Sequence, residues 1–302
     1  MEKKCTNVGG QAVIEGVMMR NGSLVATAVR KPNGEIVYKK TYISSNRKKI
    51  FQLPFIRGAV VLFDSLVVGM KELTFSANES EENEEEQLSN KEAIMTTIFS
   101  LALGIGLFIV IPSIISTFLF NGNKGYTNIC EGILRLVLFL GYIWAISFSK
   151  DIKRVFQYHG AEHKTIYAYE NNKELTPENA KAFTTLHPRC GTSFLLTVML
   201  IAIIVFSLID YILPTPDTVY MKVLLRVVLR IIMMPLIAGI SYEFQRFSSN
   251  HLDNIFIKAL AYPGLALQKI TTKEPDLKQL EVAIVAMKVA LGLEVDNARE
   301  TK

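Results

Sequence analysis

The stretch IMTTIFSLALGIGLFIVIPSIISTFLF, residues 94–120, contains no charged side chain and decides the fold class of this chain. About 20 consecutive, mostly apolar residues are needed for a helix to cross the hydrocarbon core of a bilayer, and this stretch is long enough. Three further apolar stretches of similar length occupy residues 129–148, 193–213 and 221–241. Charged or Pro- and Gly-bearing connections separate the four stretches. The sequence therefore predicts an α-helical polytopic membrane protein with four transmembrane helices.

The distribution of lysine and arginine predicts how these helices are oriented. The connection 149–192 carries seven basic residues, whereas the loops 121–128 and 214–222 carry one each. Because basic residues collect in cytoplasmic connections, we expect the connection 149–192 and both termini to be cytoplasmic. The net charge of +5 fits this bias and does not indicate a nucleic-acid partner. The expected partner is the lipid bilayer.

The three cysteines, Cys5, Cys130 and Cys190, fall in different compartments under this topology. Cys130 is expected near the outer surface and the other two on the cytoplasmic side, so no disulfide framework is predicted. The first ten residues are polar, and we expect no signal peptide there.

Residues 10–45 alternate between apolar and polar side chains, a pattern typical of short antiparallel strands. Turns are expected at Asn21-Gly22 and at Pro32-Asn33-Gly34. The three predicted strands are 11–19, 24–29 and 36–43. A β-ribbon of this size cannot bury a core alone, so it must pack against another element.

The segment 53–75 repeats apolar side chains at helical spacing and is expected to be an amphipathic helix. It could lie on the membrane surface, or it could pack against the ribbon as its core partner. Arg57 and Asp64 interrupt its apolar residues, so it is not expected to cross the membrane. With the ribbon it forms a predicted cytoplasmic domain, residues 1–77.

An acidic flexible linker, a transmembrane domain and a cytoplasmic helical tail follow, over residues 78–92, 93–245 and 246–302. The linker contains seven glutamates and almost nothing apolar. In the tail, Gln279–Leu291 has the pattern of an amphipathic helix that begins after Glu274-Pro275-Asp276.

The most specific chemical motif is His159-Gly160-Ala161-Glu162-His163, on the expected cytoplasmic extension of the second transmembrane helix. On a helix the two imidazoles lie one turn apart, where both can reach one metal ion, with a carboxylate between them. The histidines belong to a mostly apolar stripe at three- and four-residue steps: Ile152, Phe156, His159, His163, Ile166 and Glu170. Histidines on such a stripe either form hydrogen bonds in a packed core or bind a metal.

A zinc enzyme needs a third protein ligand and an open coordination position. The candidate ligands are Glu170, on the same stripe, and His187 and Cys190, just before the third transmembrane helix. The topology brings them to the cytoplasmic membrane boundary with the motif histidines, so the sequence predicts a divalent metal, with zinc as the first choice. Glu162 is then the expected general base. The alternative is a polar network that pins the helix ends without a metal.

Glu15 is a further candidate at this site. It is the one acidic side chain in the segment Gly9–Arg20, and it is flanked by Ile14 and Gly16 in a ribbon without its own core. We expect it to point at another element, and the nearest polar target is the histidine site, as a ligand or as a group that orients one. An exposed position on a strand is the alternative.

A second set of charged side chains lies in the outer part of the predicted bundle, where an unpaired charge is costly. Its members come from the second, third and fourth transmembrane helices: Glu131, Arg135, Asp210, Arg226 and Arg230. Interhelical ion pairs are the favoured interpretation, and a substrate or ion path is the alternative.

Four segments of the chain resemble the hallmark sequences of the YqhQ family: Gly9–Arg20, Tyr158–Lys164, His187–Phe194 and 274–284. This is a family of bacterial membrane proteins described as predicted metal-dependent enzymes, without an agreed reaction. The resemblance covers nearly the whole chain. It implies a location in the bacterial cytoplasmic (inner) membrane and a metal site, and it implies no substrate.

Two functions from different classes follow. The first is a membrane-embedded metal-dependent hydrolase that acts on a lipid or a peptide bond at the cytoplasmic membrane boundary, as the His-x-x-Glu-His motif favours. The second is a non-catalytic scaffold or accessory factor for membrane-protein insertion or assembly, whose ribbon domain and acidic linker contact a membrane-protein partner. Transport is a weaker option, since no paired broken helices are evident.

Overall fold

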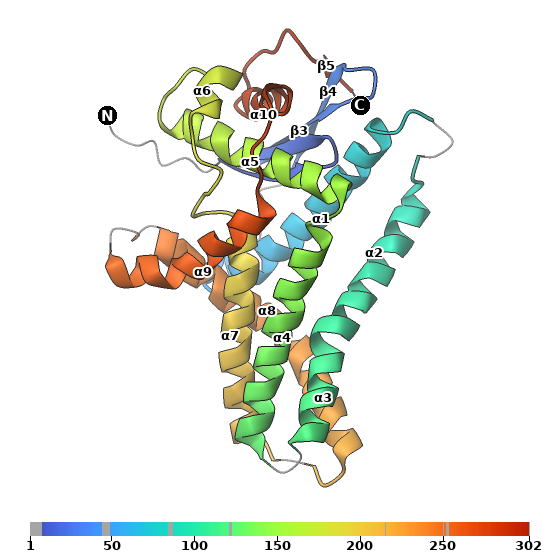
Figure 1. Ribbon diagram of the computed structural model, residues 1–302, viewed down its shortest axis with the longest axis vertical. Helices are drawn as coiled ribbons and strands as arrows, with labels where there is room; N and C mark the ends of the chain where they lie inside the picture. Colours follow the sequence, from blue (N-terminus) through green and yellow to red (C-terminus); the bar gives the residue numbers. More distant parts are fainter. Residues whose placement is uncertain are drawn as a thin grey trace.

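The computed structural model describes residues 8–43, 49–83, 87–120, 123–214, 216–249, 251 and 254–301. Within these residues the chain is mostly helical and carries a small β-sheet formed mainly by its N-terminal part (Figure 1). Four helical segments of the described chain are long and apolar enough to cross a membrane: Asn90–Leu119, Lys124–Ile146, Gly191–Ile212 and Val219–Ser248. They coincide with the four predicted stretches, and Figure 1 shows the sheet at one end of the bundle that they form.

The first of these segments has a local irregularity that its sequence explains. It consists of α2 (Asn90–Ile105), a π-helical turn η3 (Gly106–Val110) and α3 (Ile111–Leu119). Pro112 stands in the first turn of α3 and has no N–H to donate to the preceding turn, which is where π-turns and kinks form. The other three segments are α4 (Lys124–Ile146), α7 (Gly191–Ile212) and α8 (Val219–Ser249).

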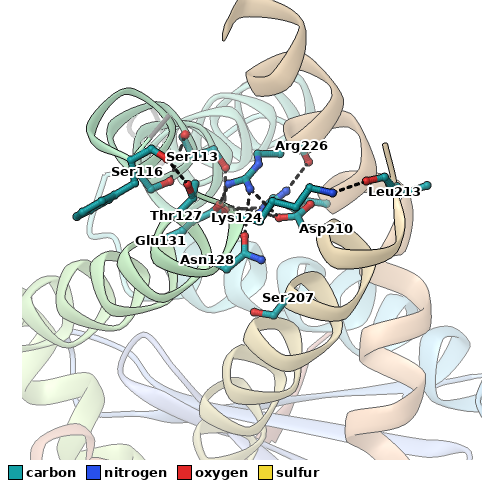
Figure 2. A network of polar contacts seen from close by, with 12 residues as sticks. Ser113, Ser116, Lys124, Thr127, Asn128, Glu131, Ser207, Asp210, Leu213 and Arg226 are labelled. Atoms are coloured by element: carbon teal, nitrogen blue, oxygen red, sulfur yellow. Dashed lines mark hydrogen bonds and ion pairs between the residues drawn. The ribbon is translucent and has the colours of Figure 1, made fainter. Parts of the chain in front are cut away.

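The predicted ion pairs between the transmembrane helices are confirmed (Figure 2). Glu131 on α4 is the centre of the cluster: it accepts hydrogen bonds from Arg230 at 2.6 and 2.7 Å, from Arg226 at 3.2 Å, and also pairs with Arg135. Asp210 on α7 pairs with Arg230 at 3.0 Å and with Arg226 at 3.3 Å. Three helices are therefore joined through buried charges.

The β-sheet has one more hairpin than the sequence pattern predicted. Strands β1 to β4 form an antiparallel meander, and β5 pairs parallel to β4; their bounds are Val8–Val13, Gly16–Asn21, Leu24–Arg30, Ile36–Tyr42 and Arg299–Glu300. The predicted strand 11–19 is wrong, because Val13 pairs with Gly16 across a two-residue turn at Ile14 and Glu15. Glu15 has a φ of 49°. Because neither Ile14 nor Glu15 is a usual turn former, nothing in the alternation of apolar and polar side chains marked the turn.

Both faces of the sheet are buried. One face packs against α10 (Leu277–Ala290) and α5 (Lys150–Glu170) through Val17, Met19 and Leu280. On the other face, Met18 and Val25 pack against Leu73 of α1 (Ile56–Glu79). The helix α10 confirms the predicted tail helix, and the Asp276 side chain caps it as part of a reciprocal capping box with Gln279.

Helix α1 (Ile56–Glu79) is the core partner of the ribbon, which is one of the two placements predicted for it. It also packs against α8, where Arg57 pairs with Glu243 at 2.5 Å. Phe63 and Leu66 are 67% and 58% exposed on this helix, so a membrane-surface contact for that face stays a prediction.

The chain between and after the transmembrane helices differs from the prediction in two ways. Helix α4 ends at Ile146 and α5 begins at Lys150 as a separate helix, which lies across the top of the bundle in Figure 1, so the histidine motif is not on an extension of the second span. A helix that the sequence analysis did not identify, α9 (Ile255–Thr271), follows α8. A short helix α6 (Pro177–Lys181) and a 3-10 turn η1 (Lys49–Gln52) complete the structure.

Helices enter the predicted acidic linker from both sides, since α1 runs to Glu79 and Ser89 caps α2. The glutamates at 84–86 and Cys5 lie outside the described residues.

Candidate metal centre

The structure brings together three of the predicted ligands. His159 and His163 lie one turn apart on α5, with ring centroids 4.5 Å apart. Cys190 is the N-cap residue of α7. One potential ligand atom from each lies within 4.8 Å of the other two, and all three side chains are buried. Among the described residues, this is the group of His, Cys, Asp and Glu side chains that could hold a metal ion.

Hydrogen bonds at Nδ1 fix the tautomers of the two imidazoles. Nδ1 of His159 lies 2.8 Å from the carbonyl oxygen of Thr271, and Nδ1 of His163 lies 2.5 Å from that of Thr185. A carbonyl oxygen only accepts, so each Nδ1 carries the proton and donates it. In the neutral ring Nε2 then has a lone pair, as in histidines that bind metals.

These lone pairs are directed into the cluster. Nε2 of His159 lies 3.1 Å from Sγ of Cys190. Nε2 of His163 is buried and has no hydrogen-bond partner in the part of the chain that the structure describes. A buried imidazole nitrogen without a partner is costly unless something binds it. Two imidazole nitrogens and one cysteine sulfur match the ligands that zinc prefers.

Burial favours the neutral form of one imidazole. It lowers the pKa of His163, and the interaction with Cys190 opposes this shift. Burial also raises the pKa of Glu162, while the imidazoles of His159 and His187 and the backbone N–H of Gly10 partly oppose this shift. Glu162 is not a member of the three-residue group. It faces strand β1, where a Cβ atom at Gly10 would come within 2.9 Å of its Cγ.

His187 and Glu170 lie beside the cluster and not in it. The His187 ring centroid is 5.6 Å from that of His163, and its Nε2 is 3.7 Å from a carboxylate oxygen of Glu170. Glu170 also forms an ion pair with Arg189. Of the three candidate third ligands, the structure thus brings Cys190 next to the two histidines, while His187 and Glu170 lie beside each other.

Glu15 does point at another element, but the structure does not bring it to the histidines. Its carboxylate forms a two-fold ion pair with Arg154 on α5 and accepts a hydrogen bond from the Tyr158 hydroxyl at 3.3 Å. The reason is the hairpin at Ile14 and Glu15, which places this side chain near the first half of α5. Glu15 therefore fixes the sheet on the helix that carries the motif.

Close backbone packing explains the glycine in the motif. Lys273, just after α9, donates its N–H to the carbonyl of Phe156 at 2.9 Å. A Cβ atom on Gly160 would come closer than 3.0 Å to the Lys273 carbonyl oxygen, a separation that real Cβ atoms do not show. Gly160 lets α5 approach the segment that presents the Thr271 carbonyl to His159.

Two residues that position the site were not identified from the sequence. Lys164 is buried and donates to the carbonyls of Lys181 at 3.0 Å and Phe183 at 2.5 Å, which holds the loop that ends in Thr185. Gln268 is fully buried on α9 and bonds both the N–H and the carbonyl of His187 at 2.8 Å. A single amide in the apolar stretch of α9 was the available signal for Gln268. Carbonyl partners such as those of Thr185 and Thr271 leave no signal in the sequence.

Comparisons with known proteins agree with the resemblance. A family model described as "Protein of unknown function (DUF1385)" matches residues 53–293. The chain is 36% identical over 313 residues to "Uncharacterized protein YqhQ" of Bacillus subtilis (strain 168), covering 97% of this chain and 95% of that protein. No solved structure matches significantly. The chain therefore belongs to the DUF1385 family, which the YqhQ resemblance had indicated.

Proposed function

We propose that His159, His163 and Cys190 bind one divalent metal ion, zinc by the chemistry of the donors, and that the protein is a metal-dependent hydrolase of the membrane surface. One observation carries the proposal: both imidazoles donate Nδ1–H to backbone carbonyls, while Nε2 of His159 lies 3.1 Å from the cysteine sulfur and the buried Nε2 of His163 has no hydrogen-bond partner among the described residues. Three protein ligands leave a fourth zinc position open, which is the arrangement of catalytic and not structural sites. A zinc ion held by His159, His163 and Cys190 would supply a water of lowered pKa and a Lewis acid for a substrate carbonyl.

Glu162 is the proposed general base. It lies on the same helix as both histidines, and its raised pKa makes its Oε atoms better proton acceptors than those of an ordinary surface carboxylate. The expected substrate is a lipid ester or a peptide bond close to the membrane surface, because the centre lies between the sheet and the transmembrane bundle.

The metal content of the purified protein tests this proposal. Elemental analysis should find about one zinc per chain in the wild type, and His163→Ala and Cys190→Ser should lose it. His251→Ala is the matched control: His251 is the fourth histidine of the chain, and it is exposed, with Nδ1 on the Phe247 carbonyl. Glu162→Gln should retain the metal and abolish hydrolysis in a screen of phospholipid and peptide substrates. Wild-type protein purified without a bound metal would refute the proposed metal-dependent hydrolase function.

A second function, a non-catalytic scaffold or accessory factor for membrane-protein insertion or assembly, is favoured by one specific observation. His163 and Glu162 are only 1% and 5% exposed, and the cluster joins α5 to the ends of α7 and α9. In such a protein the centre holds the sheet domain on the bundle. A metal-loaded protein whose Glu162→Gln variant supports growth and membrane assembly like the wild type would favour this function.

We further propose that the chain lies in the bacterial cytoplasmic membrane with both termini in the cytoplasm, as its basic residues indicate. In intact cells a membrane-impermeant maleimide should then leave Cys5 unmodified. A cysteine introduced as Tyr220→Cys, at an exposed position at the start of α8, should react and serves as the positive control. Modification of Cys5 from outside would overturn this topology.

A further inference from the structure

The end of the bundle far from the sheet contains a cavity of about 120 Å³ that the metal centre does not use. It lies among α3, α4, α7 and α8, beside the ion-pair cluster drawn in Figure 2. Its polar lining comes from all four helices: Thr117, Lys124, Thr127, Asp210, Lys222 and Arg226. A cavity of this size has room for several waters or for one tetrahedral oxyanion.

The charges around the cavity do not balance. Leaving Lys222 aside, four cationic side chains meet there, three from the ion-pair cluster and one from the lining: Arg135, Arg226, Arg230 and Lys124. Glu131 and Asp210 are the buried carboxylates of the cluster, and Asp217 is exposed on the loop before α8. Positive charge therefore remains in excess at this end of the bundle, and the part of it on Arg226 and Arg230 is buried among the helices. An anion in the cavity would compensate it.

A buried hydroxyl gives independent evidence for a ligand. Thr117 is only 3% exposed and lines the cavity, and its Oγ1 has no hydrogen-bond partner among the described residues. Because burial of an unpaired hydroxyl costs free energy, a partner that accepts its proton would stabilise it. The Lys124 ammonium is held at the same place by the Leu213 carbonyl at 2.8 Å, which uses one of its three protons.

We propose that this cavity binds the phosphate group of an anionic ligand, either free phosphate or a phospholipid headgroup. An oxyanion with several acceptor oxygens suits donors that converge from different helices: an ammonium, a guanidinium and a hydroxyl. The depth also fits, because Lys124 begins α4, Leu213 follows α7 and Lys222 is in the first turn of α8. Helix ends lie at the level where the headgroup phosphates of a bilayer are found.

Native mass spectrometry of the full chain in detergent tests the proposal, with phosphatidylglycerol as the probe and diacylglycerol as the phosphate-free control. Thermal stabilisation by inorganic phosphate, at constant ionic strength, is the second arm. The wild type should bind one phosphatidylglycerol in preference to diacylglycerol, or be stabilised by phosphate. Lipid binding that excess phosphate does not displace identifies a headgroup, and stabilisation by phosphate without lipid retention identifies the free anion.

Two variants make the test specific. Lys222→Gln should weaken binding about tenfold or more, since a charge-assisted hydrogen bond is lost. Thr117→Val should weaken it several-fold without lowering the unfolding temperature, because the hydroxyl has no hydrogen-bond partner to lose among the residues that the structure describes. Lys150→Gln, which removes an exposed lysine at the other end of the bundle, should bind like the wild type. Equal binding by all four proteins, or no preference for either phosphate probe, overturns the proposal.

Discussion

Replacing Glu131 with glutamine should lower the stability of the protein by about 3–5 kcal/mol, the usual loss when one partner of a buried ion pair is removed. Glu131 accepts hydrogen bonds from Arg226, Arg230 and Ser113 and pairs with Arg135. Glutamine keeps the size of the side chain but leaves three guanidinium groups with Asp210 as their remaining carboxylate in the cluster. The unfolding temperature in detergent and the membrane yield should both fall sharply.

An exposed ion pair provides the control for Glu131→Gln. Glu300 on β5 pairs with Lys40 at 2.9 Å, but its side chain is 51% exposed. Because solvent screens such pairs, Glu300→Gln should cost less than about 1 kcal/mol. If the two variants unfold at the same temperature, the buried cluster does not hold the bundle together.

Gly160→Ala should destabilise the protein by about 3 kcal/mol or more and should also reduce its metal content. The new methyl group would overlap the Lys273 carbonyl oxygen, which belongs to backbone and cannot rotate away as a side chain can. The segment after α9 must then move, and with it the Thr271 carbonyl that orients His159. Thermal unfolding and elemental analysis of the same preparation measure both effects.

Gly141→Ala is the matched control, since Gly141 is also within a helix, but a Cβ atom there would meet no atom of another element of the described chain within 4 Å. Alanine is the better helix former by up to about 1 kcal/mol, so this variant should be as stable as the wild type or more so. A Gly160→Ala variant that matches it in stability and metal content would show that the close approach at Lys273 is unimportant.

The four helices that are long and apolar enough to cross a membrane were predictable because their signal is physical and local. An apolar run of the right length is sufficient to identify a span. The partners of Glu131 were predictable for a similar reason: an unpaired charge in a bilayer is costly, so opposite charges at the same depth are expected to form ion pairs. The Ile14–Glu15 hairpin was not, because its residues have no turn preference and the alternation of side chains passes through it.

The same distinction applies to the candidate metal centre: some of its residues could be predicted from local sequence spacing, and others depend on tertiary contacts. The spacing of His159 and His163 is set by one helical turn, so the pair could be identified from the sequence. The choice of Cys190 over His187 depends on how the start of α7 meets α5. Likewise, Glu15 is directed to Arg154 by a hairpin that the pattern concealed. Contacts between elements distant in the chain decided each of these outcomes.

X-ray absorption spectroscopy of the purified wild-type protein at the zinc edge tests the central claim most directly. We expect one sulfur at about 2.3 Å and two imidazole nitrogens at about 2.0–2.1 Å, with a lighter atom in the remaining position. Cys190→Ser should lose the sulfur contribution, and His251→Ala should give the wild-type spectrum. A protein that holds no zinc or other divalent metal, or a metal without sulfur in its coordination shell, would contradict the assignment of His159, His163 and Cys190 as its ligands.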